Sequence, residues 1–159
     1  IYSRGGYSTQ DIDMVCPGGP DLQQVMLTLG FERLGKDYIY PQNKLYVEFP
    51  SSFLGQTETT QWFDVEGHRI QIVSLEDLIV DRLCAFKFWG SALEGFNSIL
   101  LLESNPVNDL RLEERALQED VLDALKIVRE IRETIVRKNF SPKQSNALLE
   151  QAIKRLKTP

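Results

Sequence analysis

The sequence predicts an α+β protein, with a mixed sheet in its first half and helices in its second half. Between residues 10 and 73, short apolar runs alternate with polar residues and are separated by Gly, Pro and Asn, which is typical of strands joined by turns. From residue 74 onward the apolar residues recur at helical spacing. With 159 residues, of which 42% are hydrophobic, the chain can bury one proper core and carry a helical appendage.

The first half is expected to contain several strands and one short helix. The alternating runs predict strands at 10–15, 37–40, 45–49, 61–65 and 69–73. A helix is expected over 21–29, between a Pro-Gly-rich break and Gly30, and its apolar face is formed by Leu22, Val25, Met26 and Leu29. These elements predict a mixed sheet with one helix packed against it.

The second half is expected to be helical to its end. Ser74 with Asp77 predicts a capped helix over 74–89, and a further helix is expected over 92–103. One longer helix of about 25 residues is expected beyond the break at 104–109, because an apolar stripe recurs at helical spacing. The stripe consists of Leu117, Val121, Leu125, Val128, Ile131 and Ile135. Ser141, Pro142 and Gln144 predict the start of a last helix.

Two carboxylates stand two positions apart in the first expected strand, in the run Ser8-Thr9-Gln10-Asp11-Ile12-Asp13-Met14-Val15. Side chains at positions i and i+2 of a strand share a face, so Asp11 and Asp13 project together. Neighbouring carboxylates repel one another unless a cation or a proton lies between them. The pair is therefore a candidate magnesium site, and the alternative is a solvated acidic pair on an edge strand or loop.

A third carboxylate, Glu48, lies in the run 44–49, which predicts another strand. Three carboxylates from two neighbouring strands would be enough to hold one or two magnesium ions against a triphosphate. Gly5 and Gly6 lead toward the first strand, and such glycines either let the backbone approach a phosphate or make a turn.

Several motifs follow one another in an order that resembles a known family. They are Ser-Thr-x-Asp-Ile-Asp, a helix with a Leu-Gly-Phe turn, a strand ending in Glu-Phe-Pro, and then Val-Ser-Leu-Glu-Asp-Leu-Ile-Val-Asp-Arg-Leu-Cys-Ala-Phe-Lys. Over the first two thirds of the chain, this order resembles the nucleotidyltransferase-like proteins of the DNA polymerase β superfold. Within that superfold it is most similar to small prokaryotic proteins related to toxin–antitoxin and abortive-infection nucleotidyltransferases.

The resemblance implies a nucleotidyltransferase-like core over 1–103, with a mixed sheet and helices on one side, and a helical C-terminal region over 104–159. The family usually carries a Gly-Gly or Gly-Ser motif upstream of the acidic pair, where a turn into a helix grips the nucleotide phosphates. Because the chain opens at Ile1 and not at a methionine, an N-terminal helix with this motif is expected upstream of the printed sequence.

Carried over residue by residue, the resemblance implies that Asp11 and Asp13 are paired ligands of Mg²⁺ or Mn²⁺ and that Glu48 is the third acidic ligand. Ser8 and Thr9 would lie near the phosphates of a nucleoside triphosphate. The implied reaction transfers a nucleoside monophosphate to a hydroxyl of an RNA or a protein and releases pyrophosphate, with Glu48 helping to activate that hydroxyl.

Two cations, Arg82 and Lys87, interrupt the apolar spacing of the expected helix over 74–89. A cation that faces the carboxylates would neutralise triphosphate charge in the transition state, so both are candidate nucleotide-binding residues. The alternative for each is a solvated or ion-paired position on the helix surface.

The C-terminal helices are basic, since residues 126–157 contain nine Lys or Arg and three Glu, a local net charge of +6 in a chain whose net charge is −5. A basic surface can meet an acidic partner, including RNA or DNA. No aromatic-rich platform for stacking bases accompanies it, which favours solvated helix faces. These helices are also expected to pack as a hairpin against the sheet, against a partner protein or against a second copy of the chain.

Several other chemistries are excluded. His68 is the only histidine and lies in an expected turn, so a His-based triad or a His-rich metal site cannot be built. Neither a Walker glycine loop nor a Rossmann fingerprint occurs. Cys16 and Cys84 lack metal-site spacing and are expected to be small buried hydrophobes. No apolar run is long enough to cross a bilayer, and a cytoplasmic protein is expected.

The sequence therefore predicts a metal-dependent nucleotidyltransferase that uses a nucleoside triphosphate. The main alternative is a catalytically inactive protein of the same fold, which acts as an interaction module or as a toxin–antitoxin component. A third hypothesis is a nucleic-acid-binding adaptor built on the basic C-terminal helices.

Overall fold

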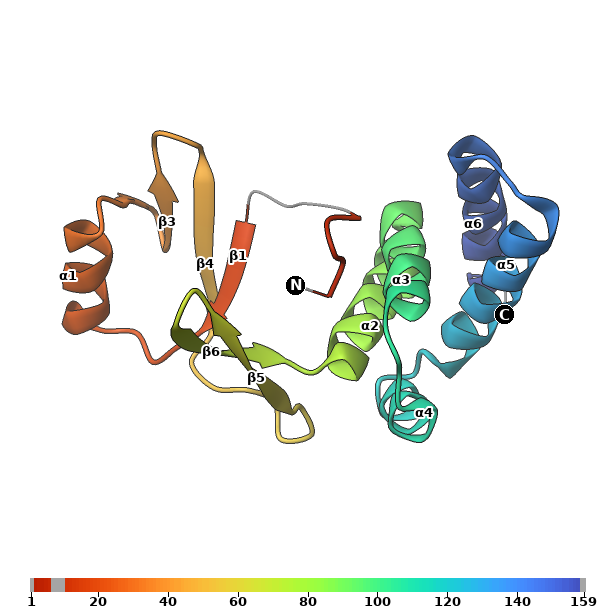
Figure 1. Ribbon diagram of the computed structural model, residues 1–159, viewed down its shortest axis with the longest axis horizontal. Coiled ribbons are helices and arrows are strands. Elements are labelled where there is room, and N and C mark those ends of the chain that lie inside the picture. The colour runs from red at the N-terminus through yellow and green to blue at the C-terminus, as the bar shows by residue number, and fades with distance from the viewer. Residues whose placement is uncertain (1, 7–10, 158–159) are drawn as a thin grey trace. The chain divides into compact units, whose positions relative to one another are not determined.

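The computed structural model describes residues 2–6 and 11–157 (Figure 1). These residues form six α-helices, one π-helical turn and six strands, which confirms the α+β class. The chain divides into two compact units: a sheet unit, Ser8–Gln56, and a helical unit, Ile1–Tyr7 with Thr57–Pro159.

The sheet unit contains a four-stranded mixed sheet in the order β1-β4-β3-β2. Its strands are β1 (Asp11–Val15), β2 (Glu32–Leu34), β3 (Asp37–Tyr40) and β4 (Leu45–Ser51). Strand β1 runs parallel to β4, and the other neighbours are antiparallel. The sequence analysis missed β2, because its three exposed residues are too few to display an alternating pattern.

Helix α1 (Pro20–Thr28) belongs to the same unit and lies beside β3 in Figure 1. Met26, Tyr38 and Val47 form the buried core of the unit, with Leu22, Phe31 and Phe49 packed against them. The prediction that Val25 and Leu29 also lie on the buried face of α1 is wrong for this unit, since their side chains are 53% and 60% exposed. One side of the helix, centred on Met26, packs on the sheet.

The helical unit contains the hairpin of β5 (Thr60–Val65) and β6 (His68–Val73). Val65 pairs with His68, so the turn is the two-residue loop Glu66-Gly67. Both residues have positive φ, 50° and 81°, which matches the right-handed twist of the two strands. The hairpin expected from the alternating pattern is confirmed.

Helix α2 (Leu75–Cys84) follows directly, and Ser74 caps it by accepting a hydrogen bond from the Asp77 backbone N–H, as predicted. The expected single helix over 74–89 instead changes at Ala85 into a π-helical turn, η1 (Ala85–Trp89). Gly90 ends it with a φ of 71°, a left-handed conformation that glycine adopts readily. A π turn is rare and cannot be predicted from apolar spacing.

Helices α3 (Ala92–Ser104), α4 (Asp109–Gln118), α5 (Leu122–Lys138) and α6 (Pro142–Leu156) complete the helical unit. The unit has one core, whose largest fully buried side chains include Phe86, Ile79, Leu83, Ile99, Leu101, Leu112, Leu125 and Leu149. Helices before and after residue 104 share this core.

The long helix expected over about 25 residues is wrong, because the chain breaks between α4 and α5. Asp120 adopts a φ of 56° there, and the N–H of Val121 donates to the Ala116 carbonyl while the N–H of Asp120 donates to the Leu117 carbonyl. This pair of bonds is a Schellman motif, which ends a helix. The break separates Leu117, which is 66% exposed, from the apolar stripe that continues buried along α5.

Within residues 2–6 and 11–157, no helix is both long and apolar enough to cross a membrane.

Candidate functional site

The acidic pair predicted from the sequence lies on β1, and the parallel pairing of β1 with β4 adds the third carboxylate. Asp13 stands opposite Glu48, and Asp11 stands opposite Tyr46. In a parallel pair, opposite residues point to the same face of the sheet, and residues two apart on one strand share that face. The backbone register therefore brings Asp11, Asp13 and Glu48 to one face.

That face is the accessible one in the sheet unit. Asp11 and Asp13 are exposed and Glu48 is half-buried. The opposite face carries Val47, which lies between the two residue positions that pair with the carboxylates and is 3% exposed in the core beneath α1. The sheet therefore separates its packing face from a face that carries three acidic groups, two on β1 and one on β4.

Carboxylates of this kind suit Mg²⁺, which prefers hard oxygen ligands. Among the described residues, no group of three or more His, Cys, Asp and Glu side chains is arranged to hold a metal ion by itself. Magnesium is usually bound by one or two carboxylates together with waters and substrate phosphates, and not by a cage made of protein groups alone. The donor set of Asp11, Asp13 and Glu48 fits that mode of binding.

Two further predicted residues, Ser8 and Thr9, lie outside the residues that the structure describes. Arg82 and Lys87 belong to the helical unit, where each has carboxylate partners. Arg82 contacts Glu94 and Asp81, with N–O distances of 3.1 Å to each. The role of all four in nucleotide binding stays a prediction.

Lys87 ties η1 to the break between α4 and α5. Its ammonium lies 3.0 Å from an Asp123 oxygen and 3.3 Å from an Asp120 carboxylate oxygen, and it also donates to the Asp120 carbonyl. Burial lowers the pKa of Lys87, but the hydrogen bonds to Asp123 and Asp120 outweigh it and raise the pKa above its ordinary value. These contacts are the ion-paired alternative considered for this residue from the sequence.

A cavity in the sheet unit lies at the start of α1 and is lined by two cations, Arg33 and Lys36, that sequence reasoning did not select. Tyr38 and Phe49 also line it, and both lie on the packing face with Val47. The cavity therefore opens on the face of the sheet opposite the three carboxylates.

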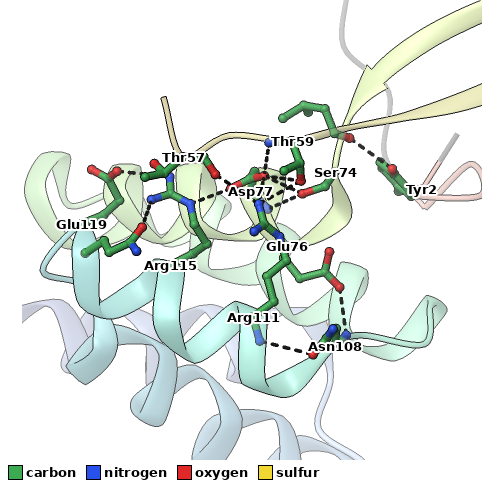
Figure 2. Close-up of polar contacts among 12 residues, drawn as sticks. Tyr2, Thr57, Thr59, Ser74, Glu76, Asp77, Asn108, Arg111, Arg115 and Glu119 are labelled. Atoms are coloured by element: carbon green, nitrogen blue, oxygen red, sulfur yellow. Dashed lines mark hydrogen bonds and ion pairs between the residues drawn. The ribbon is translucent and has the colours of Figure 1, made fainter. Parts of the chain in front are cut away.

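The most extensive buried polar cluster of the described residues surrounds Asp77 on α2 (Figure 2). The Asp77 side chain, 1% exposed, accepts hydrogen bonds from the Ser74 hydroxyl at 2.6 Å and the Thr59 backbone N–H at 2.9 Å. Arg115 donates to its other oxygen at 2.7 Å, and Arg111 donates at 2.8 Å. The cluster joins the start of β5, the start of α2 and one side of α4.

Opposing effects set the charge of this cluster. Burial by itself raises the pKa of Asp77, but hydrogen bonds from Ser74, Arg115, Thr59 and Arg111 lower it to about 2. Asp77 is therefore a carboxylate at neutral pH, balanced by two guanidinium groups. The sequence showed the helix cap at Ser74 and Asp77, but no local signal linked it to arginines more than 30 residues away. Because donors occupy both oxygens of Asp77, the cluster stabilises the fold and offers no open ligand.

A scan against protein-family models, a search of curated proteins and a search of solved structures each found no match. The structure is that of an α+β protein, with an acidic sheet face in one unit and a buried ion-pair cluster around Asp77 in the other.

Proposed function

We propose that this chain is a nucleotidyltransferase that binds a nucleoside triphosphate together with Mg²⁺ or Mn²⁺. The observation that supports the proposal is the register between β1 and β4, in which Asp13 stands opposite Glu48 with Asp11 on the same face. The motif order of the sequence, which resembles the DNA polymerase β superfold, points to the same chemistry.

In the proposed site, Asp11 and Asp13 would hold the metal through their carboxylate oxygens. The metal supplies Lewis-acid stabilisation of charge on the triphosphate. The oxygen of an acceptor hydroxyl forms a bond to the α-phosphorus, and its proton passes to Glu48. The bond from the α-phosphorus to the bridging oxygen of the β-phosphate breaks, and pyrophosphate leaves. The acceptor is a hydroxyl of an RNA or a protein.

Calorimetric titration of ATP and the other nucleoside triphosphates, with and without Mg²⁺, tests the proposal. Wild type should bind one of them in a Mg²⁺-dependent manner, and the double variant Asp11→Asn/Asp13→Asn should not. The matched control is Asp21→Asn/Glu32→Gln, which removes the same charge at two exposed positions of the sheet unit and should bind normally. The proposal is rejected if wild type binds no triphosphate, or if the Asp11/Asp13 variant binds as well as the control.

Transfer itself is measured with α-labelled triphosphate incubated with total RNA or cell protein. The label should appear in one of these fractions with wild type, and Glu48→Gln should reduce transfer even at triphosphate and Mg²⁺ concentrations that saturate the variant. Equal transfer by wild type and Glu48→Gln would exclude Glu48 as the proton acceptor.

A second function, an interaction module without catalysis, is favoured by apolar side chains exposed on the helical unit. Trp89 is 82% exposed and Phe88 is 52% exposed at the end of η1, while Leu117 and Val136 are 66% and 67% exposed on the C-terminal helices. Contiguous exposed apolar side chains mark protein–protein contacts, and Phe88 and Trp89 are adjacent in the chain. Sedimentation equilibrium of wild type and Trp89→Ala tests this function. Wild type should self-associate, the substitution should weaken that association, and neither protein should bind triphosphates.

A further inference from the structure

A cavity of about 310 Å³ lies within the helical unit, at the lower end of the size range of small-molecule sites, which is about 300–1,000 Å³. The segment 2–6, the hairpin, the start of α2 and the end of α3 line it, and its lining residues include Tyr2, Arg4, Phe63, Glu76 and Asn105. All of them belong to one compact unit, so the cavity can be described without reference to the sheet unit.

Hydrogen bonds hold the wall formed by the segment 2–6 in place. The Tyr2 hydroxyl donates to the Val73 carbonyl at 3.1 Å, and the Asn105 side-chain amide donates to the Tyr2 carbonyl at 3.0 Å. The rings of Tyr2 and Phe63 meet edge to face, with centroids 5.5 Å apart. The cavity therefore has an aromatic wall anchored at both its backbone and its side chain.

Glu76 brings a carboxylate to this cavity that is only half satisfied. The residue is 6% exposed, and one carboxylate oxygen accepts a hydrogen bond from the Asn108 backbone N–H at 2.8 Å (Figure 2). Its second oxygen has no hydrogen-bond partner among the described residues. This oxygen is accessible to solvent, so it can accept a charge-assisted hydrogen bond from a cationic ligand.

The negative charge of Glu76 acts across the cavity. The pKa of Tyr2 is raised, first by burial and then by the charge of Glu76, because both disfavour a phenolate. The charge of Glu76 therefore favours a cation beside the aromatic wall.

Arg4 carries the opposite charge on the same cavity. Its residue is exposed, and within the described part of the chain its guanidinium forms no ion pair, with Glu76 or with any other carboxylate. Two opposite charges thus line one cavity without meeting. A ligand that carries an ammonium and a carboxylate would satisfy both groups, and guanidinium and carboxylate groups form strong charge-assisted hydrogen bonds.

We propose that this cavity binds a free α-amino acid with an aromatic side chain. Its ammonium group pairs with Glu76, its carboxylate pairs with Arg4, and its ring packs on Tyr2 and Phe63. This site is separate from the proposed nucleotidyltransferase site and does not depend on it, because none of its residues belongs to the sheet unit.

Calorimetry of the full chain with three probes tests each part of the recognition. L-Phenylalanine carries both charges, phenethylamine carries only the cation, and 3-phenylpropionate carries only the anion. Phenylalanine should bind wild type, and each single-charge probe should bind at least tenfold more weakly. A tenfold loss equals about 1.4 kcal/mol, which is within the range of one charged hydrogen bond.

Variants identify the two charged groups. Glu76→Gln keeps an oxygen to accept from the Asn108 N–H and should weaken phenylalanine binding at least tenfold, as should Arg4→Gln at its exposed position. The matched control is Glu133→Gln, an exposed position on α5, which should bind like wild type. Thermal unfolding checks that every variant is folded. If Glu76→Gln does not fold, the result with Arg4→Gln decides the test.

The proposal is overturned if phenylalanine gives no binding at millimolar concentration. It is equally overturned if the folded variants at positions 76 and 4 bind phenylalanine as wild type does, or if either single-charge probe binds as tightly as phenylalanine.

Discussion

Replacing Asp77 by alanine removes the acceptor that joins α2 to α4, and should destabilise the protein far more than the loss of any exposed ion pair. The substitution leaves Arg115, whose side chain is 6% exposed, without its buried partner, and leaves the Thr59 N–H without an acceptor. Breaking a buried pair by removing one member costs about 3–5 kcal/mol. Arg115 keeps its contacts with Gln118 and Glu119, so the lower end, about 3 kcal/mol, is expected.

The pKa of Asp77 gives an independent value for the free energy that its ionised side chain contributes to folding. It is about 2 in the folded protein against an ordinary 3.8, and a shift of one unit corresponds to about 1.4 kcal/mol, so ionisation of Asp77 stabilises the fold by about 2 kcal/mol. A lowered folded pKa contributes stability that is fully present above the unfolded pKa and is lost as the pH falls through the folded pKa. The contribution should therefore be present at pH 5 and largely absent by pH 2.

Urea unfolding of wild type and Asp77→Ala at pH 7, 5, 4 and 3 measures both effects. The control is Glu113→Ala, which removes a carboxylate that is 49% exposed from its pair with Arg129 and should cost about 0.2–1 kcal/mol. The free-energy gap between wild type and Asp77→Ala should narrow as the pH falls. A gap below 1 kcal/mol at pH 7, or one that does not change with pH, would refute this account of the cluster.

Two further predictions concern the helical unit. Gly95→Ala on α3 should lower the melting temperature, because the added Cβ would lie 2.7 Å from Phe86 and 2.9 Å from Leu149, both fully buried. Overpacking costs about 1–3 kcal/mol, which exceeds the gain in helix propensity of about 1 kcal/mol. An unchanged or higher melting temperature would contradict it. Burial, together with Glu119 and Asp81, raises the pKa of Cys84 to about 11, so iodoacetamide at pH 8 should alkylate Cys84 slowly in the native protein and rapidly in denaturant. Mass spectrometry of the two states checks this, and equal rates would contradict it.

Features that depend on neighbouring residues were predictable from the sequence. The caps at Ser74 and Ser141 are formed as expected, since the capping groups stand three positions apart and need no distant partner. The hairpin was predicted across Glu66-Gly67-His68 because alternating runs flank this segment, but His68 belongs to β6 and the turn is Glu66-Gly67 alone. The break at Asp120 was not predicted, because neither a glycine nor a proline marks it and apolar spacing continues across it.

For the candidate sites, the sequence indicated which residues could take part but not which residues they would contact. Alternation alone placed Asp11 and Asp13 on one face of a strand and placed Glu48 on a second strand. It did not give the parallel register that sets Asp13 opposite Glu48, because pairing between strands more than 30 positions apart depends on how the whole sheet packs. Lys87 could be recognised as a cation on a helix, but its partners at Asp120 and Asp123 depend on where α5 begins.

By itself, then, the sequence determined the α+β class, the capped helix starts at Ser74 and Ser141 and the strand that carries two carboxylates, since each follows from the local preferences of adjacent residues. Only the tertiary structure decided the division into a sheet unit and a helical unit, the two arginines that balance Asp77, and the placement of Arg4 and Glu76 along one cavity. The physical reason is that burial and charge pairing depend on distances in space, which residues far apart in the chain acquire only when they pack.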